Sequence, residues 1–335
     1  MGNRIAPGSF PRKKLNWDKK MHWYFIVLIA IFAIIFLCTT FSLLLYITTA
    51  KRGHSILVNK NGYISEARRD ILNKQREAEA HLSELNTEQL TMTSFDGLKL
   101  KATYIRSKEN RGKLAVLSHG YGSTGTLAFS IYVPFYLKQG FDIIMPDHRA
   151  HGASEGKYMD FGQYSSRDIC DWCALIKEKY GDRKIYLHGI SMGTAAVLLA
   201  SARGEIENLT AVVADCGYAN LNSEFKYVLK SRMHLPAFPF LNICSLINKI
   251  NSGFFFSEVN PIDAVKKLNL PVLFIHGKKD FLIPYMMSEK MFLSCPSLNK
   301  QLLIVEEARH TSSFFFDKEG VTTAMLNIFG ESSEK

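Results

Sequence analysis

The stretch that decides the fold is KIYLHGISMGTAAVLLASARG, residues 184–204. Its apolar opening, Lys184–Gly189, predicts a short buried strand, and the Ala- and Leu-rich Thr194–Ala202 predicts a packed helix. Between them lies GISMG, which has the pattern G-x-S-x-G. Glycines two residues either side of a serine remove Cβ atoms that would clash in a sharp strand-to-helix turn. We expect Ser191 at a helix N-terminus, where developing negative charge is favoured, as a nucleophile rather than a simple N-cap.

Strands and helices alternate on both sides of this stretch. Strands are predicted at 113–118, 141–146, 209–214, 270–276 and 301–306, and helices at 126–138 and 164–180. Short apolar strands separated by helices form a mostly parallel sheet covered by helices on both faces. Right-handed crossovers bring the carboxyl ends of such strands to one edge, where ligands bind. The fold class is therefore α/β.

Residues 89–335 are predicted to form this α/β domain. It would begin with a hairpin, because residues 89–105 alternate around the turn Asp96-Gly97. Residues 218–260 are too long for a simple crossover and are rich in Phe and Leu, so we expect a helical cap inserted over the strand ends. The charged residues 51–88 are predicted to form a helical linker. We expect a solvated spacer there rather than a helix that lies on the membrane or on the domain.

The apolar segment 23–50 contains no charged residue. As a helix it would be about 42 Å long, which is more than the roughly 30 Å hydrocarbon core of a bilayer. A cleaved signal peptide has a shorter apolar region of about 7–15 residues, so an uncleaved transmembrane anchor is predicted. Residues 1–22 form a basic tail, but basic residues also follow the span. The small excess of basic residues before the span favours a single-pass protein of the cell membrane with an extracytoplasmic body.

Charge and cysteine content exclude several functions. The net charge is +10, and half of it comes from residues 1–22. No basic cluster in the body interleaves with aromatic residues, so no nucleic-acid partner is expected. Five of the six cysteines lie outside the apolar segment, and this odd number argues against a fully paired disulfide framework. It also weighs mildly against an extracytoplasmic body. Cys170 and Cys173 have C-x2-C spacing without a second pair, so neither a metal site nor a cofactor is predicted.

A serine nucleophile needs a base and an orienting carboxylate at the same edge of the sheet. His310 stands just past the last predicted strand, where a base lies if the chain order is Ser, acid, His. Asp280 follows the preceding strand in HGKKD and is the predicted acid. Asp215, which ends an earlier strand, is its competitor. We prefer Asp280 because the turn at Gly277 can aim it inward.

An oxyanion hole needs two backbone N–H groups. One is expected from Met192, directly after the nucleophile. The other is expected from Tyr121, in the glycine-containing HGYG that follows strand 113–118. Flanking glycines would let this backbone approach a substrate closely.

These motifs together resemble the α/β-hydrolase superfamily over roughly residues 89–330. They stand in the order of the family: HGYG at 119–122, DHRAHGAS at 147–154, GISMG at 189–193, HGKKD at 276–280, and His310. Ala150 stands where the family commonly has Gly. The nearest similarity is to membrane-anchored bacterial serine hydrolases of the serine-aminopeptidase-like, esterase and lipase branch.

The resemblance implies acyl transfer through a covalent Ser191 ester, hydrolysed by water that His310 activates. The apolar cap and the membrane anchor favour a small carboxylic ester with an apolar acyl or aromatic group as substrate. Three alternatives stay open: an aminopeptidase-like serine peptidase, an acyltransferase on the same site, and an inactive hydrolase-fold binding protein. The expected partners are this ester and, through residues 23–50, a lipid bilayer.

Overall fold

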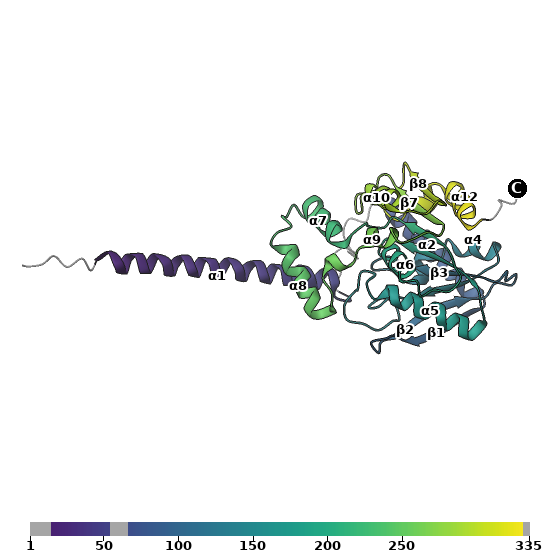
Figure 1. Cartoon of the computed structure of the whole chain (residues 1–335), viewed down its shortest axis with the longest axis horizontal. Helices are drawn as coiled ribbons and strands as arrows, with labels where there is room; N and C mark the ends of the chain where they lie inside the picture. Colours follow the sequence, from purple (N-terminus) through teal and green to yellow (C-terminus); the bar gives the residue numbers. More distant parts are fainter. Residues whose placement is uncertain (1–14, 54–65, 331–335) are drawn as a thin grey trace, which may run out of the picture.

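An eight-stranded sheet lies at the centre of the computed structural model, which describes residues 15–53 and 66–330 (Figure 1). The strand order is β1-β2-β4-β3-β5-β6-β7-β8. The strands are β1 (Thr87–Thr93), β2 (Lys99–Ile105), β3 (Lys113–Ser118), β4 (Phe141–Pro146), β5 (Lys184–Ile190), β6 (Leu209–Asp215), β7 (Val272–Gly277) and β8 (Lys300–Val305). β1 pairs with β2 and β2 with β4 in antiparallel register, and the other neighbours are parallel. The predicted mostly parallel sheet and the D-G hairpin are confirmed.

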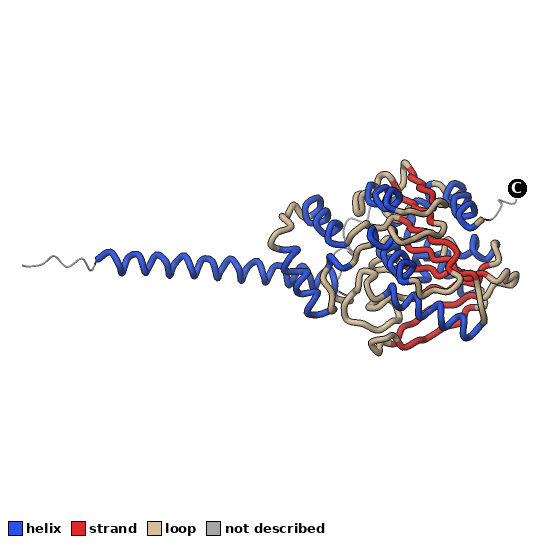
Figure 2. Tube along the Cα trace, viewed as in Figure 1, coloured by secondary structure: helices blue, strands red, loops and turns tan. Residues whose placement is uncertain are grey.

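Helices cover both faces of this sheet (Figure 2). One face packs against α5 (Ser165–Tyr180), α6 (Met192–Arg203), α9 (Pro261–Val265) and α10 (Met286–Ser294). The other packs against α3 (Gly125–Phe129), α4 (Val133–Lys138), α11 (Ser313–Phe316) and α12 (Lys318–Phe329). Successive strand residues alternate between these two cores, as Leu114 and Ala115 of β3 do. Burial on both faces explains the continuous apolar runs of the parallel strands.

A third apolar core lies over the carboxyl edge of the sheet. It joins residues of the inserted segment 218–260 to Met192 of α6 and to Tyr46 and Ala50 of the N-terminal helix. The inserted segment forms α7 (Leu221–Arg232), α8 (Phe240–Ser252) and the short helix η2 (Phe256–Glu258). We call the segment 218–260 the cap. The apolar residues that bury its underside also cover the edge of the sheet where a parallel α/β fold places its ligands.

The N-terminal helix α1 (Leu15–Ala50) projects from this body as a long rod (Figure 1). Its stretch Lys20–Ala50 is long and apolar enough to cross a membrane. Residues 1–14 of the predicted basic tail and residues 54–65 of the predicted linker lie outside the described residues.

Two expectations about helices are wrong. The single helix expected at 126–138 is split into α3 and α4, because Pro134 lacks an N–H and begins a new helix. The expected solvated spacer, α2 (Glu66–His81), instead packs on the domain. The Ser130 hydroxyl donates to the Gln75 carbonyl at 2.9 Å, and Thr126 Oγ1 donates to Glu79. A further short helix η1 (Leu82–Glu84) ends this segment, and β1 begins at Thr87 where helix was expected to continue.

Candidate active site

The predicted sharp turn is present at Ser191, between β5 and α6. Ser191 has φ +57°, a region that side chains other than glycine seldom adopt. A Cβ at Gly189 would lie 2.3 Å from the Gly193 carbonyl oxygen. A Cβ at Gly193 would lie 1.9 Å from the Ser118 carbonyl oxygen. Both glycines of G-x-S-x-G are therefore required by close backbone contacts. The backbone strain of the turn lies at Ser191, which has the positive φ.

The structure brings Ser191, His310 and Asp280 together from three different strand ends. Ser191 Oγ lies 2.9 Å from His310 Nε2, and His310 Nδ1 lies 2.7 Å from Asp280 Oδ2. A carboxylate can only accept, so Nδ1 carries a proton and Nε2 is left to accept one from the hydroxyl. The residue Ser191 is only 7% exposed, so the site lies beneath the body's surface.

The carboxylate of Asp280 is held from both sides. Its Oδ1 accepts from the backbone N–H groups of Leu282 and Ile283, both at 2.9 Å, and its Oδ2 also lies 3.2 Å from His276 Nε2. Burial by itself opposes ionisation of Asp280. The imidazoles of His310 and His276 outweigh it and hold the pKa of Asp280 well below its ordinary value. Asp280 is therefore ionised and fixed in the orientation that His310 needs.

His276 is a contributor to which the sequence analysis assigned no role. Its Nδ1 lies 2.7 Å from the Ser288 hydroxyl, while two acceptors, Asp280 Oδ2 and the Ile283 carbonyl, face Nε2. Nε2 therefore carries the proton and donates toward the carboxylate. The spacing of four residues between His276 and Asp280 around Gly277 was the signal available in the sequence. A Cβ at Gly277 would lie 2.4 Å from the Ala308 carbonyl oxygen, so this turn also needs its glycine.

The competing carboxylate, Asp215, lies in a different environment. Its Oδ2 accepts from the Tyr132 hydroxyl at 3.2 Å, and burial raises its pKa to about 6. Its backbone carbonyl accepts from Ser191 N and from Thr194 Oγ1, at 2.8 and 2.7 Å. Asp215 thus supports the turn through its main chain, whereas the carboxylate hydrogen-bonded to His310 is that of Asp280.

The two backbone segments expected to form an oxyanion hole flank the serine. Met192 is the first residue of α6, and the first N–H groups of a helix have no partner within the helix. A Cβ built at Gly120 would lie 3.2 Å from Ser191 Cβ, so the backbone just before Tyr121 passes directly beside the nucleophile.

His119 controls the direction of that backbone, a role the sequence reasoning missed. Its Nε2 accepts from the His148 N–H at 2.9 Å, so its Nδ1 donates to the Gly120 carbonyl at 2.7 Å. Burial lowers the pKa of His119 well below its ordinary value, which keeps the ring neutral, as this pattern requires. The carbonyl of Gly120 and the N–H of Tyr121 belong to one trans peptide and point in opposite directions. Fixing the carbonyl therefore fixes the N–H.

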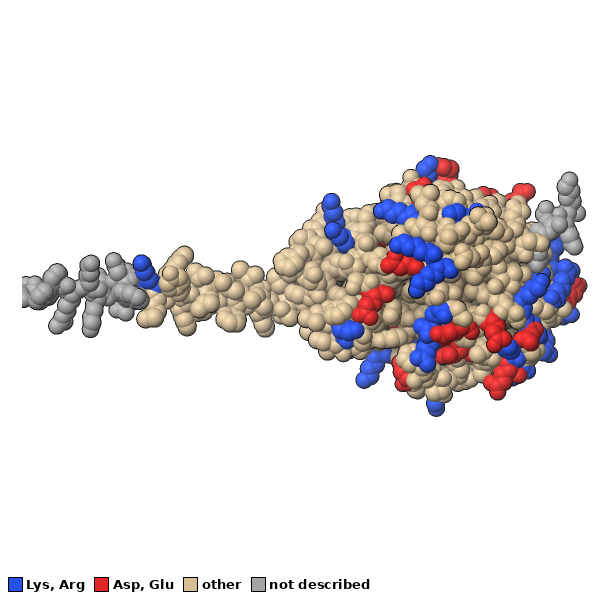
Figure 3. All heavy atoms as spheres, in the orientation of Figure 1, with Lys and Arg blue, Asp and Glu red and all other residues tan. Residues whose placement is uncertain are grey.

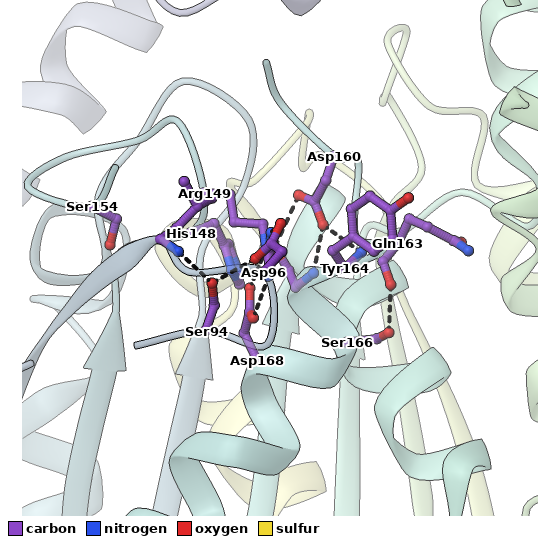
Figure 4. A network of polar contacts seen from close by, with 12 residues as sticks. Ser94, Asp96, His148, Arg149, Ser154, Asp160, Gln163, Tyr164, Ser166 and Asp168 are labelled. Atoms are coloured by element: carbon purple, nitrogen blue, oxygen red, sulfur yellow. Dashed lines mark hydrogen bonds and ion pairs between the residues drawn. The ribbon is translucent and has the colours of Figure 1, made fainter. Parts of the chain in front are cut away.

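A buried ionic network holds the loop after β4 that carries DHRAHGAS (Figure 4). Arg149 binds Asp168 of α5 with two hydrogen bonds of 2.6 and 2.8 Å, and Asp96 of the β1–β2 turn with a third of 2.6 Å. Its guanidinium also lies 4.8 Å from the ring of Phe95. The next residue, Ala150, has φ +61°, which explains why the similar family commonly has Gly there. The network therefore connects the β1–β2 turn, this loop and α5 to one another.

The cap contributes a buried carboxyl group close to this site. Glu224 lies on the inner side of α7, and its Oε2 has no hydrogen-bond partner among the described residues. Burial, together with repulsion from Asp280, raises the pKa of Glu224 to about 8 despite the attraction of Arg232. Glu224 is therefore largely protonated at neutral pH.

The comparisons with known proteins agree with this geometry. A family model described as alpha/beta hydrolase fold matches residues 116–242. The chain has the α/β-hydrolase fold. An esterase of Pyrococcus furiosus, Pf2001, superposes with a TM-score of 0.59 at 22% identity, over 74% of this chain and 93% of that one. The fold class and the family resemblance inferred from the motifs are confirmed.

Two curated relatives of this chain are informative. The uncharacterized protein YqkD of Bacillus subtilis is 29% identical over 233 residues, which are 68% of this chain and 75% of YqkD. The lysophosphatidylserine lipase ABHD12 of Xenopus tropicalis is 26% identical over 194 residues, which are 53% of this chain and 46% of that lipase. Similarity therefore extends to a protein that is named as a lipase.

Proposed function

We propose that this α/β-hydrolase is a membrane-anchored serine hydrolase that cleaves carboxylic esters. The observation that carries the proposal is the unbroken hydrogen-bond chain from Ser191 Oγ through His310 to Asp280, with bonds of 2.9 and 2.7 Å. Such a chain gives a hydroxyl a base and gives that base a fixed tautomer. The position of the chain at the carboxyl edge of the sheet, under the cap, supports the same conclusion.

The mechanism follows from these contacts. Ser191 Oγ attacks the ester carbonyl carbon while its proton passes to His310 Nε2. The carbonyl oxygen becomes an oxyanion, which the N–H groups of Met192 and Tyr121 stabilise. The C–O bond then breaks, and His310 returns the proton to the departing alcohol. A water molecule, deprotonated by His310, attacks the acyl-enzyme by the same route and releases the carboxylic acid.

The cap favours an ester with an apolar group. Three aromatic rings from separate segments meet beneath it: Phe225 lies 5.2 Å from Phe161 and 4.8 Å from Phe256, measured between ring centroids. The relative named as a lysophosphatidylserine lipase supports an ester over an amide substrate.

The test is covalent labelling of the full chain with a fluorophosphonate. The wild-type protein should be labelled and Ser191→Ala should not. Equal labelling of both would refute the assignment of the nucleophile. Hydrolysis of p-nitrophenyl esters should exceed that of aminoacyl naphthylamides, and the reverse order would make the protein a peptidase. Labelling by a membrane-impermeant probe on intact cells, and not only after lysis, would support the extracytoplasmic orientation that we propose.

A further inference from the structure

The last ten residues of α1 belong to the body and not to a free membrane span. Tyr46 is 2% exposed, and its hydroxyl lies 3.3 Å from Asn248 Oδ1 of α8. The Cys244 thiol donates to the Ser42 carbonyl at 3.3 Å, and the rings of Phe41 and Phe240 lie 5.2 Å apart. Helix α8 therefore covers one side of α1 from residue 41 onward, so lipid cannot surround α1 there.

The free part of α1 has the length of one bilayer core. Residues 20–40 span about 31 Å at 1.5 Å per residue, which matches the roughly 30 Å hydrocarbon region. Side chains in this stretch are exposed on all sides of the helix, and Val27 and Cys38 alone among residues 20–40 are half-buried. A bilayer centred on residues 20–40 would end at residue 41, where α8 begins to contact α1.

The cap has exposed apolar side chains close to residue 41 of α1, where the hydrocarbon core of the bilayer would end. Phe238, in the loop that joins α7 to α8, is 77% exposed and lies two residues before Phe240, which contacts α1. Leu246 and Ile250 are exposed on one side of α8 at a spacing of four residues. On the face shown in Figure 3, the part of the body next to α1 carries few charged side chains, whereas charges of both signs are spread over the rest of the body.

The charged side chains of the cap are mostly basic: its two acids are Glu224, which is largely protonated, and Glu258, which pairs with Lys249 at 3.2 Å. Residues 225–257 contain Lys226, Lys230, Arg232 and Lys249 and no acidic residue. Exposed apolar side chains flanked by an excess of basic residues favour a surface of anionic lipid over a water-exposed position. Continuity with the spanning part of α1 points to the same partner.

We propose that the face of the cap formed by residues 233–239 and the exposed side of α8 lies in the headgroup and upper acyl region of an anionic phospholipid bilayer. The cap is then a second membrane contact beside α1. An amphiphilic ester would reach the cap from the lipid and not from bulk water, a step that rests on the proposed esterase function.

The membrane contact is tested by quenching with brominated lipid, which does not depend on activity. The full chain carrying Trp17→Phe and Trp23→Phe is reconstituted into phosphatidylcholine and phosphatidylglycerol vesicles, and a tryptophan is introduced by Phe238→Trp. Leu298→Trp is the matched control, because Leu298 is fully exposed and precedes β8 at the opposite edge of the sheet. Lipids brominated near the headgroup should cause a large loss of emission at position 238 and little at 298. Equal quenching at both positions would overturn the proposal.

The route of the substrate is tested with two esters. Phe238→Asp should lower hydrolysis of a monoacylglycerol dispersed in the vesicles about tenfold, because the aspartate resists burial at the lipid surface. Hydrolysis of water-soluble p-nitrophenyl butyrate should stay unchanged, and Leu298→Asp should alter neither. Equal loss of both activities, or of neither, would overturn entry from the lipid. Absence of any Ser191-dependent activity would refute the esterase itself, while the quenching result would still decide the membrane contact.

Discussion

Replacing Asp280 by Asn should separate the two candidate carboxylates. Asp280 accepts hydrogen bonds on both oxygens, from two backbone N–H groups at Oδ1 and from His310 and His276 at Oδ2. An asparagine has only one oxygen. With that oxygen held by the backbone N–H groups of Leu282 and Ile283, its NH₂ group faces His310 Nδ1. Nδ1 must then accept, so the proton moves to Nε2 and His310 can no longer deprotonate Ser191.

The loss in kcat/KM should be about 10⁴-fold, or about 5.4 kcal/mol of transition-state stabilisation. Asp215→Asn is the matched control, because an amide oxygen can still accept from the Tyr132 hydroxyl and the main chain is unchanged. It should cost less than about tenfold. The assay is steady-state hydrolysis of p-nitrophenyl butyrate, with circular dichroism of each variant as a check on folding. A folded Asp215→Asn that loses as much activity as Asp280→Asn would refute the assignment of Asp280.

Three further predictions concern the turn, the anchor and the cap. Gly193→Ala should cost more than about 4 kcal/mol of stability, seen as loss of folded protein, because its Cβ would lie 1.9 Å from the Ser118 carbonyl oxygen. Tyr121→Phe keeps the backbone N–H but loses the 2.5 Å hydrogen bond to the Thr49 carbonyl of α1, so it should lower the free energy of unfolding by about 1 kcal/mol in a urea titration. The pKa of Glu224 rises from 4.5 in the unfolded chain to about 8 in the fold, so stability should fall as pH rises between these values, by at most about 5 kcal/mol. Glu224→Gln should abolish that part of the fall in melting temperature between pH 5 and 9, and an unchanged fall would refute it.

The strands and the nucleophile turn were predictable because local properties determine them. Lys113–Ser118 and Phe141–Pro146 are strands with the predicted bounds, since apolar runs of this length can be buried on both faces of a parallel sheet. The G-x-S-x-G turn followed from sterics within five residues. His310 and Asp280 followed from chain order, because each stands just after a strand and strand ends share one edge.

Roles that depend on distant partners were not predictable in this way. His119 and His276 look like ordinary buried histidines in the sequence. Their functions come from a carbonyl and a carboxylate whose directions are known only in the folded chain. The break between α3 and α4, by contrast, was signalled by Pro134, which stands in the interior of the predicted helix 126–138 and cannot donate a backbone hydrogen bond there. The composition of residues 66–81 likewise predicts a helix. It does not predict that this helix packs against α3.

The apolar run of α1 lies in two different environments, which its composition does not distinguish. Residues 20–40 and residues 41–50 continue one apolar run, yet one side of the second group, with Tyr46 and Ala50, is buried against the body. Its Tyr46 and Ala50 share a core with Met192, and the Thr49 carbonyl accepts from the Tyr121 hydroxyl. The last turns of α1 therefore contact the loop of Tyr121 directly and share an apolar core with Met192, the two residues that we propose to form the oxyanion hole. It follows that α1 is more than a tether, because removing it would expose the cap core and release the loop that positions Tyr121 beside the nucleophile.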